Sequence, residues 1–169
     1  MKDTSTESIR ESYDRLADEY ARRIFNELQH KALDRELLNR FAAQVRGHGE
    51  VCDMGCGPGQ VARYLHDLGV KVFGLDLSPH MLEQARQLSP EISFLEGNMM
   101  ALDVWDGRLA GIAAFYAIVN IPQESLPFVF RANNPFGIPP TRGLSLTCPH
   151  FRHSILAHDR PNLLALPHY

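Results

Sequence analysis

The chain opens with two stretches in which apolar residues recur every three or four positions, the spacing of one face of a helix. In the first stretch these residues are Ile9, Tyr13, Leu16, Tyr20 and Ile24. In the second stretch they are Leu33, Leu37, Phe41 and Val45. Thr4 and Glu7 have capping-box spacing, and Gly47 is expected to end the second helix. The pattern therefore predicts two helices before the first strand.

Short apolar runs then alternate with further helical stretches. The runs begin at Val51, Val70, Ile92 and Leu109, and the last of them, 109–119, is almost wholly apolar, as in strands buried on both faces. Helices are expected up to Gly69, after the cap Ser78-Pro79, and over 123–131. Strands that alternate with helices indicate an α/β fold, a Rossmann-like open parallel sheet with helices on both faces.

The stretch Val51-Cys-Asp-Met-Gly-Cys-Gly-Pro-Gly-Gln60 is a strand followed by a glycine turn that opens onto a helix. The glycines at alternate positions, 55, 57 and 59, place bare backbone where a ligand comes close. Such a turn should present free N–H groups and the positive end of a helix dipole at the carboxyl edge of the sheet. A turn without a ligand would need only one glycine.

The spacing of these glycines differs from the dinucleotide fingerprint G-x-G-x-x-G, because the third glycine comes one residue early. Asp53, just ahead of the turn, suits an ammonium group or its bound water better than a pyrophosphate. The run Asp53-Met-Gly-Cys-Gly-Pro-Gly59 resembles the first motif of the class I S-adenosylmethionine-dependent methyltransferases. The resemblance extends from about Tyr13 to Arg131. It implies a methyltransferase fold with an N-terminal helical cover and S-adenosylmethionine as the cofactor.

Several residues at strand ends are candidates for the cofactor site. Asp76 ends the second strand, and its carboxylate can accept both ribose hydroxyls of an adenosine. We expect this group to face the cleft, so that its removal would change stability little. By resemblance, Asn98 should reach the adenine amine and Met99 should contact the ring, although Gly97-Asn98 could also be only a turn.

Aromatic residues extend the candidate site. By resemblance, Phe115 and Tyr116 line the methyl donor and the acceptor entrance, and Tyr13 and Tyr20 belong to the cover. All four could instead be core residues. The cofactor-binding residues predicted in full are Asp53, Gly55, Cys56, Gly57, Gly59, Asp76, Leu77, Asn98, Met99, Phe115 and Tyr20.

No catalytic residue is predicted, because methyl transfer from a sulfonium mainly requires donor and acceptor to be held at reacting distance. Asn120 stands where relatives often have histidine, which argues against a histidine base. His150, His153 and His158 lack the cysteine or acidic spacing of a metal site, so no metal is expected.

The composition changes after Arg131. The last 38 residues contain no Lys, no Glu and one acid, Asp159, but six of the 11 prolines and four of the eight histidines. Only Thr141–Cys148 alternates well enough to supply a fifth strand, so we expect Leu144–Cys148 beside the fourth strand and the last strands of the methyltransferase sheet to be missing. The predicted domains are 1–131, with a cover over 1–47 and a βα core over 48–131, and an atypical irregular tail over 132–169.

The totals exclude several classes of partner. A net charge of −3 gives no electrostatic case for nucleic acid or an anionic membrane. Because the first residues are polar, no signal peptide is expected, and no apolar run is long enough to predict a membrane span. Three cysteines, Cys52, Cys56 and Cys148, suit free thiols in the cytoplasm. Self-association through an open sheet edge is a further expectation.

These observations lead to one function and two alternatives. The first is a methyltransferase that transfers the methyl group of S-adenosylmethionine to a small-molecule acceptor. The second is a truncated, non-catalytic remnant that binds the cofactor weakly or not at all. The third, a nucleotide-dependent oxidoreductase, is disfavoured by the glycine spacing.

Overall fold

The computed structural model describes residues 4–99 and 109–117, and the backbone of three short strands at 144–147, 155–157 and 164–165. The helix predicted over 123–131, Asn120 and the three histidines of the tail lie outside these residues.

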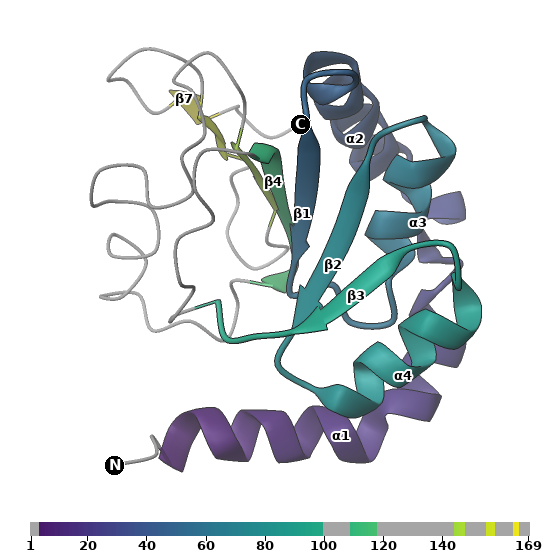
Figure 1. Ribbon diagram of the computed structural model, residues 1–169, viewed down its shortest axis with the longest axis vertical. Helices are drawn as coiled ribbons and strands as arrows, with labels where there is room; N and C mark the ends of the chain where they lie inside the picture. Colours follow the sequence, from purple (N-terminus) through teal and green to yellow (C-terminus); the bar gives the residue numbers. More distant parts are fainter. Residues whose placement is uncertain (1–3, 100–108, 118–143, 148–154, 158–163, 166–169) are drawn as a thin grey trace.

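The two helices predicted at the start of the chain are present. They are α1 (Thr4–Ile24) and α2 (Ala32–Val45), and α1 crosses beneath the carboxyl ends of β1, β2 and β3 (Figure 1). A short 3₁₀ helix between them, η1 (Glu27–His30), was not predicted. Arg35 donates to the carbonyls of Leu28 and Gln29 at 2.5 and 2.6 Å, and so satisfies backbone oxygens of η1.

A sheet forms the centre of the fold, and its first four strands match the apolar runs. These strands are β1 (Glu50–Met54), β2 (Val72–Asp76), β3 (Ser93–Glu96) and β4 (Leu109–Phe115). They are parallel in the order β3-β2-β1-β4, so β1 is interior. Cys52 of β1 is in register with Phe73 of β2 and with Ile112 of β4. All seven residues of β4 are buried, as its apolar sequence predicted.

The sheet continues past β4 into the tail. β5 (Leu144–Thr147) pairs in parallel with β4, which confirms the expected neighbour for that strand. Two antiparallel strands follow, β6 (Ile155–Ala157) beside β5 and β7 (Leu164–Ala165) beside β6. The expectation that the last strands are missing is corrected to this extent, since strands of three and two residues pair there and extend the sheet to seven. Strands this short leave no recognisable alternation in the sequence.

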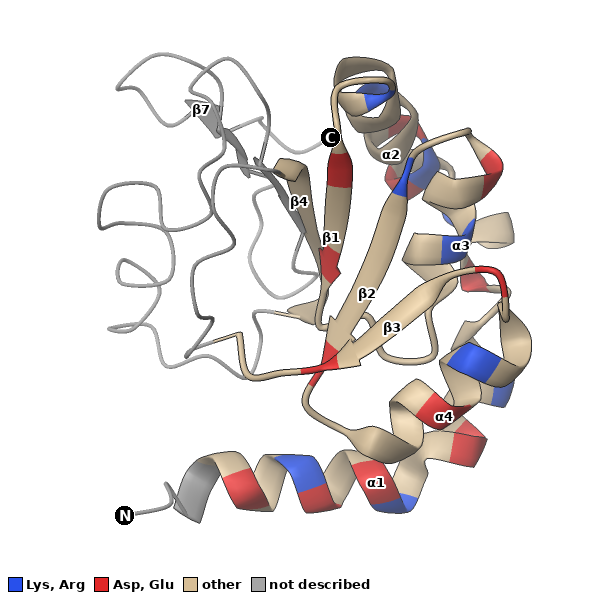
Figure 2. Cartoon of the chain, viewed as in Figure 1, with Lys and Arg blue, Asp and Glu red and all other residues tan. Residues whose placement is uncertain are grey.

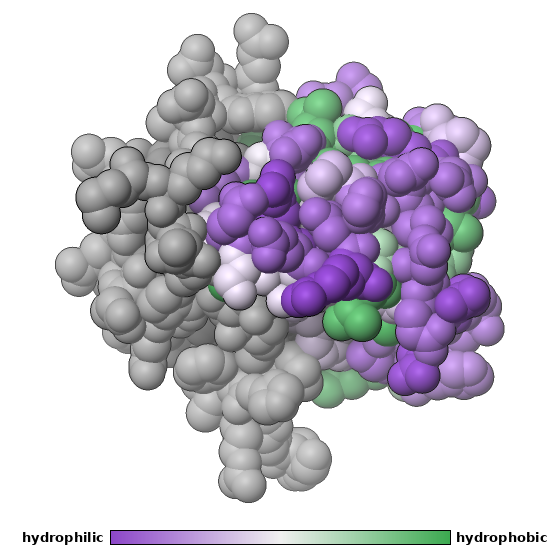
Figure 3. Space-filling model, turned by 90° about the horizontal axis from the view of Figure 1, so that it is seen from below, coloured by the Kyte–Doolittle hydropathy of each residue, from purple (hydrophilic) through white to green (hydrophobic). Residues whose placement is uncertain are grey.

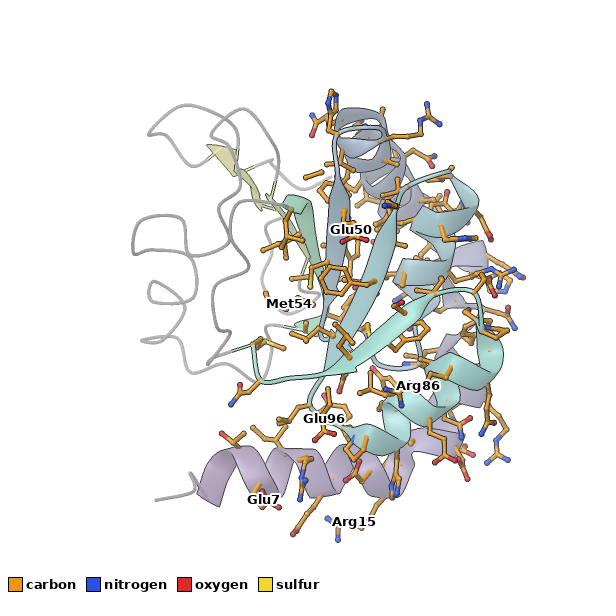
Figure 4. All side chains as sticks on the ribbon, viewed as in Figure 1. Glu7, Arg15, Glu50, Met54, Arg86 and Glu96 are labelled. Carbon is orange, nitrogen blue, oxygen red and sulfur yellow. The ribbon has the colours of Figure 1, made fainter. Side chains whose placement is uncertain are left out.

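The described helices α2, α3 (Gln60–Asp67) and α4 (Pro79–Leu88) lie on one side of the sheet (Figure 1). Two apolar clusters fill the space between. One joins α2 and α3 to the strands and contains Leu38, Phe41, Val45, Val51, Leu65, Ala113 and Phe115 among others. The other lies under α4 and contains Cys56, Ala62, Leu82, Ala85, Ile92 and Phe94. Figure 4 shows Arg86 between α4 and β3, where it donates to the carbonyl of Phe94 at 2.8 Å.

Charge is distributed unevenly over the described part. Acidic residues stand at the carboxyl ends of three strands, Asp53 in β1, Asp76 in β2 and Glu96 in β3, whereas Lys and Arg lie mainly on the helices (Figure 2). Seen from the α1 side, the described surface is hydrophilic over most of its area, with apolar residues in small separate areas (Figure 3). Within the described ranges, the structure has no helix that combines the length and apolar character needed to cross a bilayer.

Polar contacts join α1 to the start of α4. Ser78 is the N-cap of α4, and its hydroxyl accepts from the amide of Met81 at 3.1 Å. The same hydroxyl donates to Asp14 of α1 at 2.5 Å, and that carboxylate also accepts from the amide of His80 at 3.3 Å. Figure 4 shows Arg15 on the opposite side of α1, pointing away from the sheet. The cap of α4 is therefore also the attachment point of the cover.

Two buried serines flank α4 and provide a matched test of this cap. Ser78→Ala should lower the free energy of unfolding by about 1–2 kcal/mol, because it removes a helix cap and the contact with Asp14. Ser89, at the other end of the helix, is equally buried, but its hydroxyl has no hydrogen-bond partner in the described structure. Ser89→Ala should therefore be neutral or slightly stabilising. Urea unfolding measures both, and equal losses would contradict the assignment.

Candidate cofactor site

The three glycines of the turn after β1 all have positive φ, at +72° for Gly55, +52° for Gly57 and +85° for Gly59. A Cβ on Gly55 would lie 2.4 Å from the Cβ of Ala117, and one on Gly59 would lie 2.8 Å from the Phe94 ring. Among the described residues, a Cβ on Gly57 would meet only Tyr20, at 3.9 Å. Two glycines are thus required by packing, and the middle one leaves open space.

The amides of the turn are not free, contrary to the expectation from the sequence. Those of Gly55 and Cys56 donate to the Leu75 carbonyl at 2.7 and 3.0 Å, and that of Gly59 donates to the Cys56 carbonyl at 2.9 Å. The Gly57 amide donates to Asp76 at 2.8 Å. Pro58 has no N–H group. A ligand at this turn therefore meets bare Cα atoms and carbonyl groups rather than a nest of donors.

Asp76 joins the turn to the start of α4. One carboxylate oxygen accepts from Gly57 at 2.8 Å and the other accepts from the Ser78 amide at 2.9 Å. Burial raises the pKa of Asp76, while the amides of Ser78, Gly57 and Leu77 lower it. Each oxygen keeps a second lone pair, so the predicted bonds to ribose hydroxyls remain feasible. Because the carboxylate also holds the turn, its removal should lower stability as well as binding, in contrast to the expectation from the sequence.

Asp53 does not face the site. Its side chain is 2% exposed, and one oxygen accepts from the Ala62 amide at 2.9 Å in the first turn of α3. Burial raises the pKa of Asp53 to about 7, the Ala62 amide lowers it and the nearby charge of Asp76 adds to the rise. The predicted contact with an ammonium group is replaced by a cap on α3.

Of the remaining predicted residues, Met99, Leu77 and Asn98 lie at the carboxyl edge of the sheet, whereas the Cys56 side chain lies in the core. Met99 reaches the turn, because its terminal carbon lies 3.0 Å from where a Gly55 Cβ would be. Leu77 and Asn98 follow β2 and β3 at the same edge, and both are partly buried. The Cys56 side chain belongs to the apolar cluster under α4, and Cys52 and Cys56 are both free and buried. Only the backbone of Cys56 is therefore part of the turn.

Tyr20 covers the turn from α1. The Cε1 atom of its ring is the nearest described atom to the place where a Gly57 Cβ would lie. The Tyr20 ring packs against Tyr13 with ring centroids 6.1 Å apart. Burial raises the pKa of Tyr20, and nearby Tyr13, Glu27 and Asp76 add to the rise. The cover therefore brings a phenol to the same edge as Asp76, as the resemblance implied.

Phe115 belongs to the core, whereas Tyr116 is only partly buried. Phe115 is 4% exposed within the cluster beneath α2, and Tyr116 packs against the same cluster. Neighbouring residues of a strand normally point to opposite faces. The φ of +60° at Tyr116 breaks this alternation. Of the two interpretations left open by the sequence, core packing is therefore observed for Phe115, and the place of Tyr116 relative to a ligand stays a prediction.

A cluster of polar side chains beside the turn was not predicted. Tyr116 donates its hydroxyl to Asp34 at 2.5 Å, and Lys31 lies over the Tyr116 ring, 4.1 Å from its centroid. Lys31 pairs with Glu27 at 2.7 Å, and Glu27 accepts from Gln60 at 3.4 Å. The spacing of Glu27 and Lys31, four residues apart, was a recognisable signal, but their proximity to Tyr116 and Gln60 was not.

Comparison with protein-family models matches residues 51–134 to a methyltransferase domain. Among curated proteins, the chain is 28% identical over 140 residues to a malonyl-[acyl-carrier protein] O-methyltransferase of Enterobacter lignolyticus, a match that covers 82% of this chain and 54% of the relative. The chain thus spans about half the length of the curated relatives it matches.

Solved structures give the same fold. A methyltransferase of Haloferax volcanii, in complex with the Trm112 activator, has a TM-score of 0.59 and 25% identity over 79% of this chain and 58% of its own. A chain of the complex entitled DhpI-SAM-HEP has a TM-score of 0.67 at 20% identity, over 86% of this chain and 67% of its own.

Gly57→Ala tests whether the open position in the turn is ligand space. The new methyl group meets no close neighbour in the part of the chain that the structure describes, so the variant should fold with a loss of about 1 kcal/mol from the positive φ. It should nevertheless lose most binding of S-adenosylhomocysteine in calorimetric titration. Gly47→Ala is the matched control, because Gly47 also has positive φ, at +79°, and a methyl group there would have no neighbour within 4 Å. Equal binding by both variants would remove the turn from the site.

Asp53 should make stability depend on pH. Its pKa is raised in the folded state, so the folded protein binds a proton that the unfolded chain has released, and stability falls as pH rises from about 4 to about 7. The loss is on the order of 1.4 kcal/mol for each pH unit in that interval. Asp53→Asn should flatten this part of the profile in urea unfolding of the ligand-free protein. If the stability of parent and variant changed with pH in the same way, the pKa of Asp53 would not be raised in the folded protein.

The arrangement of the turn favours a cationic ligand over a pyrophosphate. A pyrophosphate needs free backbone donors, whereas here the amides of Gly55, Cys56, Gly57 and Gly59 are engaged inside the protein and the carboxylate of Asp76 lies at the turn. S-adenosylmethionine carries its positive charge on a sulfonium. The match to the methyltransferase domain, the curated relatives and the shared fold agree with this geometry. Residues 51–134 thus match a methyltransferase domain, and the fold is that of S-adenosylmethionine-dependent methyltransferases.

Proposed function

We propose that this chain binds S-adenosylmethionine across the carboxyl edge of β3, β2 and β1 and transfers its methyl group to a carboxylate oxygen of a small acceptor. The observation that carries the cofactor site is the open space at Gly57, between Tyr20 of the cover and the carboxylate of Asp76. Asp76 would accept the ribose hydroxyls, with Asn98 and Met99 beside the adenine.

A carboxylate acceptor suits the chemistry of the site. It needs no deprotonation before it attacks a methyl group, whereas a hydroxyl or an ammonium acceptor needs a base. The predicted site residues include no histidine, and Asn120 stands where relatives often have one. The Enterobacter relative is an O-methyltransferase of a malonyl group, whose free carboxylate is an acceptor of this kind.

Calorimetric titration should show binding of S-adenosylmethionine and S-adenosylhomocysteine, and no comparable binding of NADH. Asp76→Asn should weaken both cofactor forms by at least about tenfold, because charge-assisted hydrogen bonds contribute roughly 1.5–3 kcal/mol each. Asp67→Asn, which alters an exposed aspartate paired with Arg63 at the end of α3, is the matched control and should leave binding unchanged. Preference for NADH would overturn the proposal.

Turnover separates the enzyme from the non-catalytic alternative. The parent protein, incubated with methyl-labelled cofactor and a malonyl thioester, should release labelled methyl ester and S-adenosylhomocysteine. Cofactor binding without transfer to this or other small carboxylates would support the non-catalytic alternative.

A further inference from the structure

Tyr116 has an unusual backbone conformation directly after β4. Among the residues that the structure describes, it is the one non-glycine residue with positive φ, at +60°. A bulky residue is strained in this region and persists there only where surrounding contacts compensate for the strain. The contacts of Tyr116 therefore indicate which structural role this backbone conformation has.

Three contacts hold the Tyr116 side chain. Its hydroxyl donates to Asp34 at 2.5 Å, Lys31 lies 4.1 Å above the ring centroid, and the ring packs edge-on against Phe115, with centroids 6.4 Å apart. Burial, followed by the bond to Asp34, raises the pKa of Tyr116 to about 12, although Lys31 opposes the rise. The phenol is therefore a proton donor at neutral pH. Asp34 lies in α2 and Lys31 is its N-cap, so Tyr116 connects the end of β4 to the helical cover.

The conformation of Tyr116 determines where the next residue lies. Ala117 stands against Gly55, so closely that a Cβ on that glycine would be 2.4 Å from the Ala117 Cβ and 3.4 Å from its Cα. Met99 closes on the same glycine from the end of β3. A different φ at Tyr116 would move Ala117 away from the first glycine of the turn.

The order of the strands indicates which part of the cofactor this contact concerns. The ribose is assigned to Asp76 at the end of β2, and the adenine to the residues after β3. Since the order is β3-β2-β1-β4, the rest of the molecule must extend past the end of β1 towards β4. Gly55 and Ala117 are at those two ends, so they adjoin the sulfonium and the amino-acid end.

We propose that Tyr116 is a positioning residue, whose bond to Asp34 and packing beneath Lys31 hold Ala117 against Gly55 and so shape the part of the site that receives the amino-acid end of S-adenosylmethionine. This inference rests on the proposed cofactor site. Tyr116 acts through Ala117 and need not touch the ligand.

Two ligands that differ only at the amino-acid end provide the test. S-adenosylhomocysteine and 5′-methylthioadenosine share the adenosine and the sulfur, but the second lacks the amino acid. Tyr116→Phe should weaken the binding of S-adenosylhomocysteine by roughly three- to tenfold, which corresponds to part of the free energy of one charge-assisted hydrogen bond. The dissociation constant of 5′-methylthioadenosine should stay within about twofold of the parent value. Asp34→Asn keeps a neutral acceptor for the phenol and should have a smaller effect than Asp34→Ala.

Tyr64→Phe is the matched control. Tyr64 also donates its hydroxyl to α2, to Asn39 at 3.0 Å, but it does so from the exposed side of α3. This variant should bind both ligands as the parent does. If Tyr116→Phe weakens both ligands equally, or neither, the positioning role is disproved while the cofactor site stands. If the parent binds neither ligand, the proposed function itself fails.

Discussion

The carboxylate of Asp76 is the interaction on which the carboxyl edge of the sheet depends. It accepts the amide of Gly57 in the turn and the amide of Ser78 at the start of α4. Ser78 in turn caps α4 and donates to Asp14 of the cover. One buried acid therefore fixes the turn, the helix start and, through Ser78, the helix that lies over both. Removal of the acid would loosen three elements at once.

The same constraint determines what the edge can bind. The amides of Gly55, Cys56, Gly57 and Gly59 are used inside the protein, and the Asp76 carboxylate adds negative charge at the turn. Helix N-termini commonly bind anions because their donors are free. Here Asp53 occupies the first turn of α3 as an internal carboxylate, and its burial would be costly without the Ala62 amide. The carboxyl edge of the sheet is therefore better suited to a cationic ligand than to a phosphate.

Sequence reasoning succeeded where local spacing determines structure. The 3.6-residue period located α1 and α2, the Ser78-Pro79 pair located the start of α4, and an acid at the end of β2 located Asp76. It failed where orientation depends on tertiary contacts. Nothing local distinguishes an Asp53 that faces a ligand from one that faces α3. The strands β6 and β7 are too short to leave a pattern.

Tyr116 shows most clearly why the rest could not be predicted. Strand alternation predicts opposite faces for Phe115 and Tyr116, and a positive φ places both against one cluster. The side chain of Tyr116 contacts Asp34 and Lys31, which precede it by more than 80 residues. A residue whose side chain contacts the cover, and which sets the position of Ala117 against the turn, couples two parts of the chain that the sequence presents as independent. The site is thus organised from both sides, by Asp76 through the backbone of the turn and by Tyr116 through its packing.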